Sequence, residues 1–97
     1  MTKKQPKIKA AEIVVHGVVK LVFRDGFEGV VDLRPFLDRG PMFAFLKKPS
    51  EFKRVNVEIH GHYIYWVDPE GDDIEFGASQ LRRDCERQAE IHKLMAV

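Results

Sequence analysis

The stretch from Val18 to Leu33, VVKLVFRDGFEGVVDL, constrains the fold of this chain more than any other. Apolar residues alternate through its first half, which is the period of a half-buried β-strand. Asp25-Gly26 is a strong turn signal, and a three-residue loop from Arg24 to a left-handed Gly26 keeps the large apolar residues on one face. The sequence therefore predicts a β-hairpin with this register: Phe23 opposite Phe27, Leu21 opposite Gly29 and Val19 opposite Val31.

A second hairpin is predicted from Val55 to Val67, with His60-Gly61 as its turn. Its register sets Val57 opposite Ile64, and it turns one set of side chains toward the core: Val55, Val57, Ile59, Ile64 and Trp66. Shifting the loop by one position keeps the same residues facing the core, so periodicity does not fix the register of this hairpin. Tyr63 and Tyr65 face the other side.

Shorter signals fill in the rest of the chain. Strands are predicted at Glu12–His16 and Ile74–Phe76, and a helix from Ser79 to about Ala96. Asp32 is the expected N-cap of a helical turn from Leu33 to Leu37. Pro41 and Pro49 open two further turns; the first places Met42, Phe45 and Leu46 on one face, as core, and the second contains Phe52.

The resulting prediction is an α+β fold. It has a small, mostly antiparallel sheet built from two β-hairpins plus flanking strands, short helices in the middle and one C-terminal helix. Residues 1–11, with Lys3, Lys4, Lys7 and Lys9, are expected to form a flexible basic arm. Residues 12–78 are the α+β domain, and residues 79–97 form a helix that packs on the domain or on a partner.

Composition narrows the function. A net charge of +1 gives no general attraction to nucleic acid or to a membrane surface. A single cysteine suits the reducing cytoplasm, and neither a signal peptide nor a spanning segment is expected. No cofactor or small-molecule substrate is predicted.

The sequence contains few side chains that could act as a catalytic nucleophile. Cys85 lies on the inner stripe of the C-terminal helix, where an inert packed thiol is expected. Ser50 and Ser79 stand where helix starts favour small polar residues, and Thr2 lies in the arm. The sequence predicts a protein that is not an enzyme.

Two alternatives stay open. His60 and His62 flank Gly61 at strand spacing, so a small metal-dependent enzyme is one alternative, with His16 as a third ligand if its strand end lies nearby. The other is a nucleic-acid-binding accessory that uses the lysine arm or the face of Tyr63 and Tyr65. The acidic loop DPEGDDIE lacks the spacing of an EF-hand, so we expect it to be solvated rather than to bind calcium.

The C-terminal helix carries a narrow, partly apolar stripe that would bury poorly on its own. The predicted partner surface combines this stripe with the tyrosine face: Tyr63, Tyr65, Leu81, His92 and Met95. The sequence therefore favours a protein-interaction or regulatory module, whose partner is another protein or a second copy of the chain.

Three segments, LVFRDGFEGVVDLRPFL, MFAFLKKPSEFKRVNVE and IYWVDPEGDDIEF, resemble a small bacterial family catalogued as domain of unknown function 2442. The likeness covers roughly Glu12 to Leu81 and consists mostly of turn and core residues. It implies a compact α+β domain, and it implies that some relatives act as partners of small toxin-like proteins. Other relatives carry a helix-turn-helix, for which the single terminal helix here is too short. The resemblance supplies no catalytic residues, and it allows an antitoxin-like role.

Overall fold

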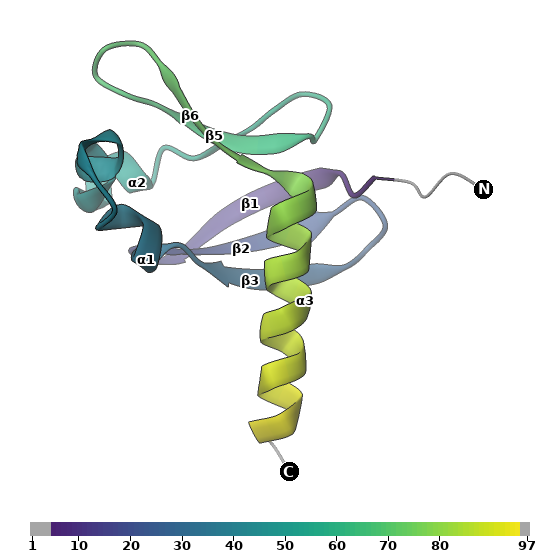
Figure 1. Ribbon diagram of the computed structural model, residues 1–97. Helices are drawn as coiled ribbons and strands as arrows, with labels where there is room; N and C mark the ends of the chain where they lie inside the picture. Colours follow the sequence, from purple (N-terminus) through teal and green to yellow (C-terminus); the bar gives the residue numbers. More distant parts are fainter. Residues whose placement is uncertain (1–4, 96–97) are drawn as a thin grey trace.

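The first hairpin forms as predicted and gains a third strand. A computed structural model describes residues 5–95, and in it β1 (Ile8–Val15), β2 (Val18–Phe23) and β3 (Glu28–Asp32) form an antiparallel sheet in the order β1-β2-β3 (Figure 1). Val19 pairs with Val31 and Leu21 with Gly29. The N–H of Phe23 donates to the carbonyl of Phe27 at 2.8 Å, and Gly26 has a φ of 93°. The three-residue loop is confirmed.

The first strand begins at Ile8 rather than at Glu12, so the predicted flexible arm is wrong from Ile8 to Ala11. Ile8 pairs with Phe23 and is 1% exposed, because the alternation that ends at Ile13 extends back to it across a bulge. The N–H of Ile8 also donates to the carbonyl of Gly61 at 2.8 Å. The predicted lysine arm therefore becomes an edge strand from Ile8 onward, while Lys3 and Lys4 lie outside the described residues.

Three short helices follow: α1 (Arg34–Leu37), η1 (Pro41–Lys47) and α2 (Pro49–Phe52). Asp32 stands one position before the N-cap of α1, which is Leu33, although its Oδ1 still accepts the N–H of Arg34 at 3.0 Å. Met42 is 61% exposed, so its predicted place in the core is wrong. The segment is a 3₁₀-helix, in which residues three apart align. Phe43 and Leu46 therefore face the core together.

The second hairpin forms a separate sheet rather than extending the first. Strands β4 (Asn56–Val57), β5 (Tyr63–Val67) and β6 (Asp73–Gly77) pair antiparallel in that order, and Val57 pairs with Ile64 as predicted. Ile59 is 83% exposed, against expectation. The chain leaves the strand before Ile59, because the carboxylate of Glu58 accepts the N–H groups of His60 and His62 and folds the loop into a tight turn.

The C-terminal helix α3 (Ala78–Met95) starts directly after β6 and packs its first turns against β3 and β6. The α+β fold class is confirmed, with the strands divided between two three-stranded sheets. The core lies between the sheets, the short helices and the first turns of α3. Its largest buried side chains are Trp66, Phe23, Phe52, Ile8, Leu21, Leu33, Leu46, Ile64 and Leu81.

One pair of aromatic residues fixes the short helices to the second sheet. The indole N–H of Trp66 donates to the carbonyl of Phe52 at 2.8 Å, and the two rings stack at 5.1 Å. The rings of Phe76 and Trp66 form a T-shaped pair with centroids 5.9 Å apart. The hydrogen bond to the Phe52 carbonyl satisfies the only polar atom of the buried indole. Between residues 5 and 95, the structure contains no helix with the length and apolar character needed to cross a membrane.

Candidate functional site

The predicted partner surface does not form one patch. Tyr63 and Tyr65 lie half-buried on β5, with ring centroids 5.8 Å apart. Leu81 is 1% exposed, so its place on this surface is wrong: it faces the core at the start of α3. His92 and Met95 are exposed near the other end of the same helix (Figure 1). The structure therefore separates a tyrosine face from a helical surface.

The tyrosine face is acidic. Partial desolvation raises the pKa of the Tyr63 phenol, and the carboxylates of Glu75, Glu58 and Asp73 raise it further. Lys20 lies on β2 of the first sheet, where it pairs with Glu28 at 3.2 Å. Phosphate would meet negative charge at this face, which disfavours nucleic acid there.

The histidines are only partly brought together. The rings of His60 and His62 lie 5.7 Å apart at the turn before β5. His16 follows the far end of β1, where its Nε2 lies 2.8 Å from the carbonyl oxygen of Leu46. Over residues 5–95, no three side chains of the His, Cys, Asp or Glu type gather in a group that could hold a metal ion.

The acidic loop between β5 and β6 is organised by its own first residue. Oδ1 of Asp68 accepts the N–H of Glu70 at 2.9 Å and that of Asp72 at 2.8 Å. The side chain therefore closes the turn rather than pointing toward a shared ligand with the other acids.

Cys85 is a packed thiol, as predicted. It is 1% exposed, and burial raises the pKa of its thiol to about 11, against the smaller lowering effect of Arg82. The thiolate is the reactive species, so a thiol with this pKa is a poor nucleophile near neutral pH.

The second half of α3 is the most exposed regular segment that the structure describes. Every residue from Glu86 to Met95 is exposed, and Figure 1 shows this part of the helix projecting past the first sheet. Three apolar side chains at i, i+3 and i+4 share one side of it: Ile91 is 51%, Leu94 71% and Met95 80% exposed. We call these three residues the distal α3 face. The sequence interpretation found Met95 and missed Ile91 and Leu94, although their spacing was the available signal.

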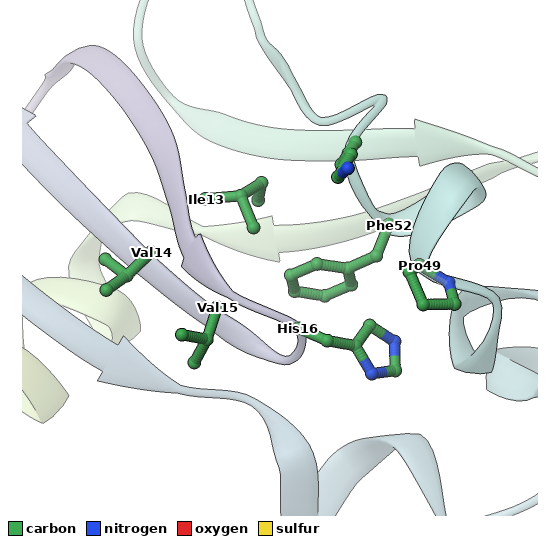
Figure 2. Close-up of a pocket in the computed structure, with 7 residues that line it drawn as sticks. Ile13, Val14, Val15, His16, Pro49 and Phe52 are labelled. Atoms are coloured by element: carbon green, nitrogen blue, oxygen red, sulfur yellow. The ribbon is translucent and has the colours of Figure 1, made fainter.

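A cleft lies between the end of β1 and α2 (Figure 2). We call it the β1–α2 cleft; its volume is about 350 Å³, and it is lined by Ile13, Val14, Val15, His16, Pro49, Phe52 and Lys53. The ring of His16 meets that of Phe52 in a T-shaped arrangement, with ring centroids 5.4 Å apart. Figure 2 shows the two side chains next to each other. The sequence interpretation missed this cleft because its two walls are far apart in the chain.

Comparisons with protein-family models, with curated proteins and with solved structures found no match to this chain. The resemblance to domain of unknown function 2442 stays a prediction.

Proposed function

We propose that this protein is a non-enzymatic protein-interaction module that docks the distal α3 face on a partner protein. The observation that carries the proposal is the exposure of Ile91, Leu94 and Met95 on one side of a projecting helix. Burying each such side chain is worth about 1.5–3 kcal/mol, so a partner with an apolar groove gains substantially from covering all three.

The buried, protonated Cys85 thiol supports the non-enzymatic part of the proposal. One form of such a module is the neutralising, antitoxin-like half of a bacterial protein pair, as the family resemblance implies. A second copy of the chain, related by a two-fold axis, is the other partner to test. We also propose a cytoplasmic location, because a lone cysteine suits a reducing compartment.

Two variants test the proposal. Leu94→Glu places a charge on the distal α3 face, whereas Ala89→Glu places the same charge on the opposite side of the same exposed helix. A partner captured from the native host is purified, and its affinity for wild-type and variant protein is measured; sedimentation velocity reports self-association. We expect Leu94→Glu to weaken the complex, or a homodimer, by at least about tenfold, and Ala89→Glu to leave it unchanged. Equal binding by both variants would overturn the proposal.

A further inference from the structure

We propose that the β1–α2 cleft is a second, separate binding site, and that it takes an extended peptide segment presenting an aliphatic side chain next to a carboxylate. The peptide backbone lies along the free edge of β1, the aliphatic side chain enters the cleft, and the carboxylate meets Lys53. The inference is independent of the distal α3 face.

The edge of β1 offers the backbone groups. β1 is the outer strand of its sheet. The bond from the Ile8 N–H to the Gly61 carbonyl joins its beginning to the second sheet, and β4 and β5 lie close to part of its length. From Lys9 to Val15, the backbone hydrogen bonds of β1 within residues 5–95 run to β2 alone. An unpaired edge of this kind accepts an added strand through main-chain hydrogen bonds.

The cleft beside that edge offers the apolar contact. Val14 is 52% and Val15 56% exposed at the end of the strand, and Pro49 lies across the cleft from them (Figure 2). Phe52 closes the floor and is fixed by its stacking on Trp66 and by the edge of His16. A rigid floor costs little ordering on binding. The volume of about 350 Å³ is at the small end for ligand pockets, which fits one or two side chains rather than a cofactor.

The charged residues around the cleft favour a carboxylate on the bound peptide. Lys53 lines the cleft, and no acidic residue is among the lining residues. Lys48 and Arg54 flank α2 as exposed cations, while the nearby acids in the sequence of the two walls are Glu51, half-buried on α2, and Glu12, exposed on β1. The balance is positive, so an anionic group on the peptide is favoured and a cationic one is repelled.

Fluorescence anisotropy with labelled peptides tests the proposal. The probe is Gly-Ser-Val-Ile-Val with a free C-terminal carboxylate, and its matched control is the same peptide as a C-terminal amide. We expect the acid to bind at least fivefold more tightly than the amide, and Lys53→Gln to abolish that difference. Lys93→Gln, which removes an exposed lysine of α3, should leave it intact. N-methylation of alternate peptide bonds should weaken binding at least tenfold if the peptide pairs with β1.

Val15→Asp gives an independent check, because it alters an exposed cleft residue without touching the core. It should weaken binding of the acid peptide at least tenfold while leaving the circular dichroism spectrum unchanged.

Several results would overturn the proposal: no binding of the acid peptide, equal binding of acid and amide, equal binding of N-methylated peptide, or binding of octanoate but not of the peptide. Dimerisation that Val15→Asp abolishes would also overturn it, because the occupant is then a second copy. Leu94→Glu should bind the peptide normally, so failure here is distinguishable from failure of the distal α3 face.

Discussion

Gly29 on β3 and Cys85 on α3 are in such close contact that no side chain fits between them. A β-carbon at Gly29 would lie 2.7 Å from Cβ and 3.1 Å from Sγ of Cys85, and 3.1 Å from a ring carbon of Phe27. This approach sets the distance between the first sheet and the packed half of α3. The direction in which the projecting half of the helix leaves the domain depends on it.

Gly29→Ala should therefore destabilise the protein, because the new methyl group has to push α3 or Phe27 away. Overpacking of this kind costs about 1–3 kcal/mol. The matched control is Gly77→Ala at the end of β6, where a β-carbon would meet nothing within 4 Å. Urea unfolding followed by the fluorescence of Trp66 measures both. Equal unfolding free energies for the two variants would contradict the close contact.

Gly61 connects the two sheets, because its carbonyl accepts the N–H of Ile8 on β1. Its substitution should lower the free energy of unfolding. It has a φ of 75°, and a β-carbon there would lie 2.6 Å from the carbonyl oxygen of Ile8. Gly71 has a φ of 90° with nothing within 4 Å, so Gly71→Ala measures the cost of the left-handed backbone alone. That cost is about 1–2 kcal/mol. Gly61→Ala should lower the unfolding free energy by about 1–3 kcal/mol more. If the two variants are equally stable, the contact with Ile8 contributes nothing.

The buried thiol of Cys85 should make stability depend on alkaline pH. Its pKa is raised to about 11 from 9.0, so the folded protein holds the proton that the unfolded chain releases first. The stability difference is fully present below about pH 9 and is lost as the pH rises toward 11, with a size of about 3 kcal/mol. Denaturant unfolding of wild type and Cys85→Ala across this range isolates the thiol from other alkaline groups. Identical pH slopes in the two proteins would contradict the prediction.

The carboxyl group of Asp25 should make the stability of the protein depend on acidic pH. The hydrogen bond from the N–H of Phe27 lowers the pKa of its carboxyl group, and the hydrogen bond and charge of Arg82 lower it further. The stabilisation is therefore present above the ordinary value of 3.8 and is lost as the pH falls through the lowered pKa. Carboxyl ¹³C NMR should show Asp25 titrating below that value. Arg82→Gln should move the titration upward, though not fully, since the bond from Phe27 remains; an unmoved titration would show that Arg82 has no effect.

Local patterns were enough for much of the architecture. The Asp25-Gly26 loop, the pairing of Leu21 with Gly29 and the inward direction of Trp66 all follow from a period of two and from turn chemistry. The exposure of Ile59 could not be predicted from these patterns. The carboxylate of Glu58 accepts the N–H groups of His60 and His62, and the strand therefore ends before Ile59. Met42 did not follow either, because the choice between a 3₁₀ and an α turn depends on what the segment packs against.

The candidate sites were harder to predict than the fold. Met95 was found from helical spacing, whereas Leu81 was wrongly placed on the surface because the same stripe is buried at one end of α3 and exposed at the other. The position of the sheet relative to the helix decides where that change occurs. The β1–α2 cleft had no local signal, since Val15 and Lys53 come together only when the two sheets pack.

By itself the sequence determined that both hairpins form, which way most of their side chains face and the loop of the first hairpin, because alternation and turn chemistry act between near neighbours in the chain. Only the tertiary structure decided that the strands divide into two sheets, that Ile8 joins Gly61, and that half of α3 is left uncovered. These features depend on contacts between segments distant in sequence, which a periodic pattern does not encode.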